Sequence, residues 1–406
     1  MASVYFRVDG NNDIATGHIM RCLTIARACR QAGNQHNRKI QILFLVSDDT
    51  SRSLLEERFE IPEEFTIYSL NSNYRQLNEE TPVLLSLIAD TANTFLDTSC
   101  GIVPKKPWLF IDSYYATSDY FRRLTASCRL AYLDDLRSFA CPVDLLINYD
   151  TEEDCSYYAQ AAHRLLGMQY TPLREQFKTQ SYTVRPEVSH VLLSTGGTDP
   201  YGVAEYLLRM IYGDTNCFEP LRITSPAEPS KPMAISRLQS LHYHVVTSST
   251  NTRYEDLCIL SRENPHIHIH ENVTDMASLM ASCDLAVSAG GTTLSELCAI
   301  GVPSISYLMA DNQRTAVERF AARGIIPCAG DIRPVPAKDT LKASPGNADT
   351  DVSDNLLPAS VISGILQFMT NMSSNFELRQ KSSHAMRAFL DGNGAGRIAE
   401  IMLADM

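Results

Sequence analysis

The first candidate catalytic residue is His18, which follows a short apolar segment and a turn rich in glycine and polar residues. The segment VYFRV leads into DGNNDIATG, and an amphipathic helix is expected to begin at about Gly17. The dipole of a helix disfavours an imidazolium in its first turn, so His18 is expected to stay neutral and to act as a general base. Asp9, at the end of the predicted strand, is expected to orient it. The alternative is that His18 only caps the helix or packs beneath a sheet.

A second candidate site is the segment SAGGTTLSEL, which combines the end of an apolar strand, a glycine turn and a helix start. Its glycines would let a phosphate approach the backbone, and the N–H groups and hydroxyls of its threonines would hold a pyrophosphate. Its last glutamate would accept hydrogen bonds from ribose hydroxyls. Glycines also serve ordinary tight turns, so a structural role stays open. The residues concerned are Gly290, Gly291, Thr292, Thr293 and Glu296.

A third loop, STGGTDP, precedes another predicted helix. Asp199 and Pro200 have the types expected at the N-cap and at the first helical position. Gly197 and Thr198 are candidates for a sugar or phosphate contact, with a plain capping turn as the alternative. The chain contains neither G-x-x-x-x-G-K-[ST] nor G-x-G-x-x-G, which argues against an ATPase or a kinase.

Two further clusters fit either a functional or a structural role. The segment HIHIH at 266–270 has the spacing of a zinc site, but alternation with isoleucine also describes a half-buried strand. We favour the strand, because no carboxylate or cysteine ligand is tied to it by spacing. Asp134 and Asp135, with Arg137, would suit acid/base chemistry or would cap a turn. Asp135 is retained as a candidate substrate contact.

These residues stand where short apolar runs alternate with helical segments, which is the pattern of parallel α/β sheets. Such sheets bind ligands at the carboxyl ends of their strands. The predicted fold class is α/β, with two Rossmann-like doubly wound domains. Together with the histidine after the first strand and the GGTTLSE segment in the second half, this arrangement resembles the GT-B architecture of nucleotide-sugar enzymes, and the resemblance implies a GT-B-like fold with a cleft between the two domains. The expected boundaries are 1–180 for a domain carrying the catalytic histidine, 188–375 for a UDP-binding domain with a loop excursion at 329–358, and 376–406 for a helical segment packing back on the first domain.

Composition excludes several classes of protein. The 406 residues are 44% hydrophobic and 20% charged, which fits a folded chain of about two domains. A formal net charge of -12 disfavours nucleic acid as a partner. The longest apolar runs are far shorter than the roughly 20 residues that span a bilayer. The start lacks the features of a secretory signal and the eleven cysteines form no C-x-x-C pair, so we expect a cytoplasmic protein with reduced thiols.

Several segments, taken in order, resemble a known family. They are FRVDGNNDIATGHIMRCLTIA, YLDD followed by CPVDLLINYD, LLGMQYTPLREQF, LLSTGGTDP, TSSTNTRYEDL and CDLAVSAGGTTLSEL. Together they are similar to the UDP-2,4-diacetamido-2,4,6-trideoxy-beta-L-altropyranose hydrolases of pseudaminic acid biosynthesis and to relatives in spore-coat polysaccharide synthesis. The resemblance covers most of residues 3–325 and the terminal DGNGAGRI, and its most specific part is the block G-H-I-x-R.

The resemblance implies that His18 activates water for attack on the anomeric carbon, which releases UDP and a free sugar. The partner is then a small-molecule UDP-sugar, with no metal or other cofactor. A GT-B glycosyltransferase that uses a UDP-sugar donor for a surface or spore-coat polysaccharide is the alternative, since both need a base at this place. By the same resemblance, residues shaping the sugar pocket would be Asp9, Gly17, Arg21, Tyr170, Arg174, Asn312 and Gln313, and those framing the uracil would be Val273 and Met276.

Overall fold

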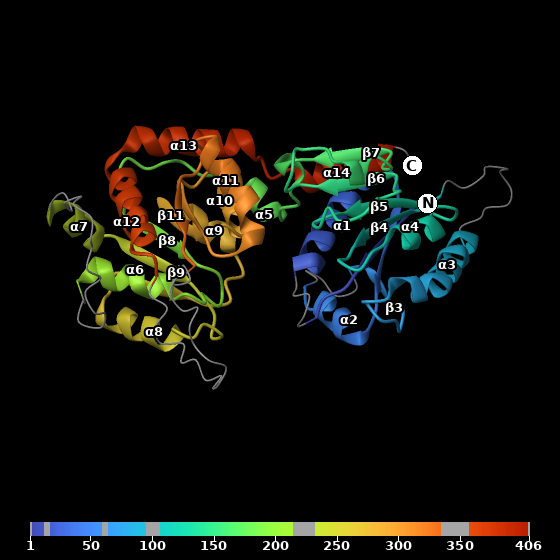
Figure 1. Cartoon of the computed structure of the whole chain (residues 1–406), viewed down its shortest axis with the longest axis horizontal. Helices are drawn as coiled ribbons and strands as arrows, with labels where there is room; N and C mark the ends of the chain where they lie inside the picture. The colour runs from blue at the N-terminus through green and yellow to red at the C-terminus, as the bar shows by residue number, and fades with distance from the viewer. Residues whose placement is uncertain are drawn as a thin grey trace, which may run out of the picture. The chain divides into compact units, whose positions relative to one another are not determined.

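The chain forms two compact units, each built around its own parallel sheet (Figure 1). The computed structural model describes residues 2–11, 17–58, 64–94, 106–213, 232–333 and 357–404. The first unit comprises Met1–Glu175 and Gly392–Met406, and the second comprises Gln176–Asp391. The chain thus passes into the second unit after Glu175, slightly before the expected boundary at residue 180, and it returns to the first unit at Gly392.

The first unit contains a seven-stranded sheet in the order β3-β2-β1-β4-β5-β6-β7, with every neighbouring pair parallel. A strand order that runs outward from β1 in both directions is that of a doubly wound sheet. The strands are β1 (Ala2–Val8), β2 (Ile40–Val46), β3 (Thr66–Ser69), β4 (Trp108–Asp112), β5 (Arg129–Leu133), β6 (Leu145–Asn148) and β7 (His163–Leu166).

Helices cover both faces of this sheet. Along β1, Val4, Phe6 and Val8 belong to the core shared with α1 and α14, whereas Tyr5 belongs to the opposite core, shared with α3 and α4. This alternation is the two-residue period of a strand buried on both faces. The helices are α1 (Gly17–Gln35), α2 (Asp49–Glu56), α3 (Leu77–Thr94), α4 (Ser118–Leu124) and α14 (Gly394–Ala404), with short 3-10 turns η1 (Ser156–Tyr158) and η2 (Met168–Tyr170). The short helix α5 (Glu175–Thr179) begins at the last residue of this stretch and continues into the second unit.

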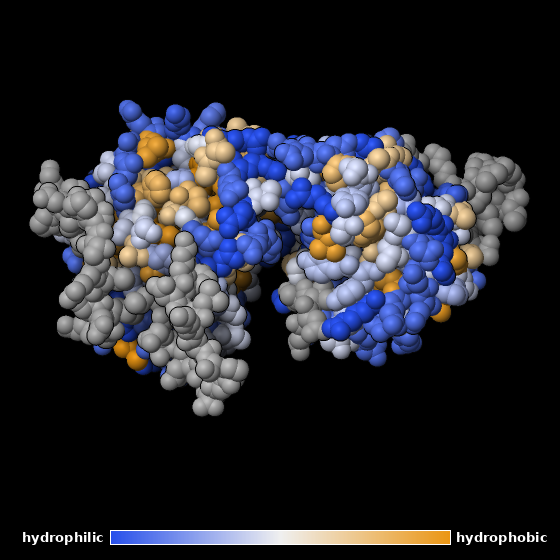
Figure 2. Space-filling view, viewed as in Figure 1, coloured by the Kyte–Doolittle hydropathy of each residue, from blue (hydrophilic) through white to orange (hydrophobic). Residues whose placement is uncertain are grey.

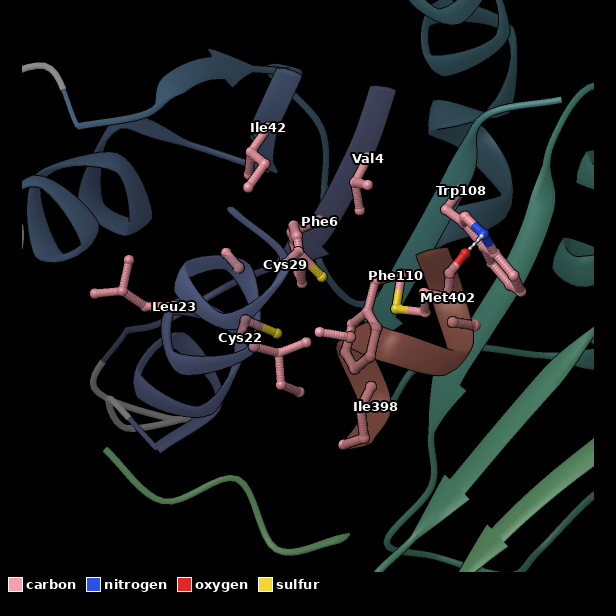
Figure 3. Close-up of a cluster of buried hydrophobic side chains, with 14 of the residues drawn as sticks. Val4, Phe6, Cys22, Leu23, Cys29, Ile42, Trp108, Phe110, Ile398 and Met402 are labelled. Atoms are coloured by element: carbon pink, nitrogen blue, oxygen red, sulfur yellow. Dashed lines mark hydrogen bonds between the residues drawn. The ribbon is translucent and has the colours of Figure 1, made fainter. Parts of the chain in front are cut away.

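The last helix, α14, is part of the first unit although it ends the described chain. Figure 1 shows it in red among the blue and green elements of that unit. It packs beside α1, and the indole N–H of Trp108 donates to the carbonyl of Met402 at 2.7 Å (Figure 3). A Cβ on Gly394 would lie 2.2 Å from the carbonyl oxygen of Thr171, so the helix starts in direct backbone contact with the segment after η2.

The second unit contains a six-stranded parallel sheet in the order β10-β9-β8-β11-β12-β13. The strands after β8 again run outward in both directions, so this sheet is doubly wound as well. Its strands are β8 (His190–Ser194), β9 (His242–Val246), β10 (Ile267–His270), β11 (Leu285–Ala289), β12 (Ser304–Leu308) and β13 (Cys328–Asp331).

One face of the second sheet carries a large hydrophobic core, made by alternate residues such as Val191, Val245 and Val287 with side chains of α6, α8 and α12. The helices of this unit are α6 (Val203–Tyr212), α7 (Pro232–Gln239), α8 (Tyr254–Glu263), α9 (Met276–Ser282), α10 (Thr292–Ile300), α11 (Arg314–Ala322), α12 (Ala359–Ser374) and α13 (Phe376–Phe389), with the 3-10 turn η4 (Asp311–Gln313). Because α13 packs on α10, the segment that returns to the first unit begins at Gly392 rather than at residue 376.

The first residues of the loop expected at 329–358 form a strand instead. They belong to β13, which pairs with β12, and residues 334–356 lie outside the described part of the chain. None of the described helices is long and apolar enough to cross a membrane. Figure 2 shows hydrophobic residues scattered among hydrophilic ones on the visible face.

Candidate active site

His18 lies in the first turn of α1, as predicted, and is paired with a carboxylate from a neighbouring strand. Its Nδ1 lies 2.5 Å from Oδ1 of Asp112, and both side chains are buried. Asp112 is the last residue of β4, which pairs with β1 so that Val8 and Asp112 are partners. The turn after β1 and the end of β4 therefore meet at the carboxyl ends of the strands.

This contact defines which nitrogen of His18 is free to react. A carboxylate oxygen 2.5 Å from Nδ1 requires a hydrogen on that nitrogen. The neutral imidazole then carries its lone pair on Nε2, which is the form needed for a general base. The ring of Tyr114 meets the imidazole edge to face, with 4.5 Å between the ring centroids, and restrains its orientation.

Arg21, one helical turn after His18, joins residues at the ends of three strands, β4, β5 and β6, into one polar cluster. Its Nε and Nη2 donate to the two carboxylate oxygens of Asp112 at 2.5 and 2.6 Å. Its Nη2 also donates to Asp135 at 2.7 Å, and Nη1 donates to the hydroxyl of Tyr149 at 2.7 Å. Bidentate pairing of this kind fixes the guanidinium plane and with it the carboxylate of Asp112, and Nη2 of Arg21 lies 3.1 Å from Nδ1 of His18.

The cluster keeps Asp112 ionised. Burial by itself would raise the pKa of this carboxyl, but the charge of Arg21 and the neighbouring His18 lower it to about 2. Burial likewise acts to lower the pKa of Arg21, whereas Asp112, Tyr149 and Asp135 raise it well above its ordinary value. At neutral pH the imidazole therefore faces a full negative charge, which stabilises the imidazolium that would form after proton transfer.

Asp9 does not orient His18, contrary to the prediction. Its carboxylate accepts from Arg7 at 2.6 Å and from the backbone N–H and hydroxyl of Ser47 at 2.7 and 2.9 Å. Arg7 is completely buried and also donates to Glu80, so Asp9 belongs to an interior network on the other side of β1. Residues 7 and 9 share one face of the strand, because side chains alternate along it. Asp9 anchors the start of the turn that leads to His18.

The two neighbouring aspartates after β5 have different partners. Asp134 is buried and accepts from the backbone N–H groups of Leu136 and Arg137, so it caps a turn. Asp135 pairs with Arg21 and belongs to the His18 cluster. The turn-capping interpretation therefore holds for Asp134, and only Asp135 is placed where a substrate contact was predicted.

His18, Asp112 and Asp135 offer ligand atoms that all lie within 4.8 Å of one another. Such a group could in principle bind a metal ion. However, Arg21 bridges both carboxylates through its guanidinium, so the positive charge that they need is already supplied. A metal ion would have to displace this buried arginine, and the cluster fits a metal ion poorly for that reason.

In the second unit, the turn after β11 leads into α10 as predicted. Gly291 is the N-cap residue and, being glycine, makes no side-chain capping bond. A Cβ on Gly291 would meet no atom within 4 Å, and Thr292 beside it is exposed. The N-terminus of α10 therefore presents backbone N–H groups and a threonine hydroxyl to a space that could hold an anion. Glu296 is half-buried one turn later.

Gly290 has a packing role that the sequence prediction did not include. A Cβ on it would lie 2.2 Å from Cγ2 of Val317 and 3.1 Å from Cβ of Gln313. Only glycine allows this approach of β11 to α11, so the two glycines of the segment serve different purposes. Gln313, predicted to contact a donor sugar, accepts from the backbone N–H of Met309 at 3.1 Å, which ties η4 to the end of β12.

The loop STGGTDP contains a capping turn, but not the one predicted. α6 begins at Val203 with Gly202 as N-cap, so Asp199 and Pro200 do not occupy the N-cap and first helical positions. The carboxylate of Asp199 nevertheless accepts from the N–H groups of Val203 and Ala204 at 3.0 and 2.9 Å. The start of α6 therefore already has a carboxylate bound to its backbone N–H groups.

The remaining predicted residues are dispersed over the two units. Those near the ends of the second sheet's strands are partly or fully exposed, apart from Met276, which is buried at the start of α9. Tyr170 packs against the core that contains α14. These remaining residues are Gly17, Tyr170, Arg174, Gly197, Thr198, Val273, Met276 and Asn312.

Three residues of the His18 cluster were missed by the sequence prediction: Asp112, Tyr114 and Tyr149. Each stands at or just after the end of an apolar run, in WLFIDSYY or DLLINYD. Because parallel strands end at the same edge of a sheet, such residues are candidates wherever a catalytic histidine follows the first strand. What the sequence lacks is the strand order, which places β4 directly beside β1.

Comparisons with known proteins support the fold and show partial sequence similarity. No protein-family model matches the chain. It is 24% identical over 170 residues to the spore coat polysaccharide biosynthesis protein SpsG of Bacillus subtilis, which is 41% of this chain and 44% of that protein. It is 36% identical over 96 residues, 22% of this chain and 27% of the relative, to the UDP-N-acetylglucosamine–N-acetylmuramyl-(pentapeptide) pyrophosphoryl-undecaprenol N-acetylglucosamine transferase of an Exiguobacterium strain. The matches thus span less than half the length of either relative.

Solved structures agree with the chain over its whole length. MurG of Acinetobacter baumannii has a TM-score of 0.57 at 13% identity, with 100% of both chains covered. The UDP-GlcNAc 2-epimerase of Neisseria meningitidis, with UDP-GlcNAc bound, has a TM-score of 0.56 at 12% identity, again covering 100% of both. These likenesses confirm the predicted fold class, a GT-B-like pair of Rossmann-like α/β domains.

Proposed function

We propose that this chain is a nucleotide-sugar-dependent enzyme that transfers the sugar of a UDP-linked donor to an oxygen nucleophile activated by His18. The observation that carries the proposal is the buried His18–Asp112 pair, which leaves Nε2 of the imidazole as the base. Asp112 is held ionised by Arg21, so the imidazolium formed on proton transfer is stabilised. The nucleophile then attacks the anomeric carbon, and the bond to UDP breaks.

The second unit supplies the complementary half of this proposal. The N-terminus of α10, with Gly291, Thr292 and Thr293, is assigned to the diphosphate, whose negative charge grows as the leaving group departs. Glu296 is assigned to the ribose hydroxyls. By the family resemblance, Val273 and Met276 would frame the uracil, and Asn312 and Gln313 would contact the sugar.

Glycosyl transfer to an acceptor hydroxyl is our first assignment. By their names, one of the similar proteins acts in spore coat polysaccharide biosynthesis and another is an N-acetylglucosamine transferase. The fold is shared with MurG, so a UDP-N-acetylhexosamine donor for a surface or spore-coat polysaccharide is the simplest expectation. These likenesses cover part of the sequence or the fold alone, and the acceptor is left open.

Hydrolysis is the second candidate, and one observation favours it. The His18 residue is only 4% exposed, which suits water better than a bulky acceptor. The resemblance of the G-H-I-x-R block points the same way, toward a UDP-linked 2,4-diacetamido-2,4,6-trideoxy sugar and the biosynthesis of a nonulosonic acid such as pseudaminic acid. Water and a sugar hydroxyl need the same base, so both assignments share His18.

The deciding experiment measures UDP release from a panel of UDP-linked mono- and diacetamido sugars, with and without candidate acceptors. Release that requires an acceptor supports the transferase, and release without one supports the hydrolase. His18→Asn should abolish either activity while UDP still binds, as titration calorimetry would report. Undiminished turnover in this variant would reject His18 as the base and the proposal with it.

A further inference from the structure

Six of the ten histidines of the chain lie on one face of three neighbouring strands in the second sheet. His190 comes from β8, two more come from β9, and three come from β10 and the residue before it. Their side chains alternate with those that enter the hydrophobic core, so the histidine face is opposite to that core. All six are partly exposed. The histidine face consists of His190, His242, His244, His266, His268 and His270.

The imidazoles on this face form three nitrogen-to-nitrogen pairs. His244 pairs with His190 at 2.9 Å and, through its other ring nitrogen, with His270 at 2.9 Å. His242 pairs with His268 at 3.0 Å. The rings also stack across the strands, with 5.0 Å between the centroids of His244 and His268 and 5.1 Å between those of His244 and His270. Strand pairing thus supplies the partners that the sequence segment HIHIH lacked by itself.

Each pair presents two nitrogen atoms at nearly the separation that a metal ion imposes. A tetrahedral zinc ion with Zn–N bonds of about 2.0–2.1 Å separates two ligand nitrogens by roughly 3.3 Å. The observed 2.9–3.0 Å would need to open by a few tenths of an ångström. To bind a metal ion in place of the shared proton, both rings have to rotate until their nitrogen lone pairs converge on one point, while the small change in nitrogen separation lets the strands stay nearly in place.

We propose that the histidine face binds divalent transition-metal ions of the zinc class, each held by two imidazole nitrogens from adjacent strands. His244 takes part in two of the three pairs: its Nε2 would share an ion with His190, and its Nδ1, on the other side of the ring, would share a second ion with His270. A donor set made of imidazoles prefers Zn²⁺, Ni²⁺ and Cu²⁺ over Mg²⁺ and Ca²⁺. This proposal does not depend on the function proposed for the His18 cluster, which lies in the other unit.

The test titrates Zn²⁺ into metal-free, untagged full-length protein at pH 7.5, by calorimetry and by competition with a chromophoric chelator. We expect saturable zinc binding that His244→Asn weakens at least tenfold. His163→Asn removes an exposed histidine from β7 of the first sheet and should leave the affinity unchanged. Mg²⁺ titrated in the same way should give no saturable binding.

Equal zinc affinities of the wild type and His244→Asn, or no saturable binding by the wild type, would overturn the proposal. If His244→Asn lowers the melting temperature of the metal-free protein, His190→Asn and His270→Asn replace it, since each removes a single pair. Each should then weaken zinc binding while the metal-free melting temperature stays close to that of the wild type. Zinc affinity unchanged in both would overturn the proposal as well.

Discussion

Replacement of Asp112 by asparagine tests the arrangement of the His18 cluster most directly. Oδ1 of Asp112 accepts from His18 and from Nη2 of Arg21, and Oδ2 accepts from Nε of Arg21. Asparagine keeps only one oxygen. If its NH₂ group faces His18, Nδ1 must become the acceptor and the proton moves to Nε2, which removes the base. If the NH₂ group faces Arg21 instead, two donors oppose each other in a buried place.

The size of the effect follows from the charge that is lost. A hydrogen bond to a charged group contributes roughly 1.5–3 kcal/mol, and Asp112 makes such a bond to Nδ1 of His18. Loss of that much stabilisation from an imidazolium-like transition state slows turnover about 10- to 10²-fold. Reversal of the tautomer adds to this, with a ceiling of about 10⁴-fold for a carboxylate in this role. We therefore expect kcat to fall between these limits.

The assay follows UDP release at saturating donor, normalised to folded protein by circular dichroism, with UDP affinity measured separately. UDP affinity should stay nearly unchanged, because the proposed diphosphate site lies in the second unit. Asp9→Asn is the matched control: it alters another buried carboxylate at the same sheet edge, one bonded to Arg7 and Ser47. It should lower stability but retain most of the turnover. A kcat within threefold of the wild type for Asp112→Asn would refute Asp112 as the residue that orients His18.

Three further predictions concern stability. Gly290→Ala places a methyl group 2.2 Å from Val317 and should destabilise the protein by about 1–3 kcal/mol. Gly291→Ala places its methyl group in open space and should change the free energy of unfolding by no more than about 0.5 kcal/mol. Urea unfolding measures both variants. Trp108→Phe removes the bond to α14 and should cost about 1 kcal/mol in the same assay, and no loss would contradict an anchoring role. Burial and neighbouring imidazoles lower the pKa of His244 to about 4. In metal-free protein, the contribution of His244 to stability is therefore present above about pH 6.5 and is lost as the pH falls toward 4. The free energy of unfolding should decline less steeply across this pH window in His244→Asn than in the wild type.

Local sequence signals predicted a large part of the fold. Apolar runs of four to eight residues that alternate with helical segments identified most strands of both sheets, because such a pattern can be buried only in a parallel α/β arrangement. The glycine and threonine turn before α10 and the position of His18 in the first turn of α1 were also predicted correctly. These features depend on neighbours in the chain, so they can be recognised without tertiary information.

The sequence by itself determined the two α/β units, the histidine after the first strand and the open helix start after β11. Only the tertiary structure decided which carboxylate orients His18, because Asp112 is 94 residues away in the chain and meets it through the pairing of β1 with β4. Strand order likewise decided that Asp9 serves an interior network, and it joined histidines from β8 and β9 to those of β10. Residue spacing along one strand assigns a side chain to a face, but the partner on that face is supplied by another strand.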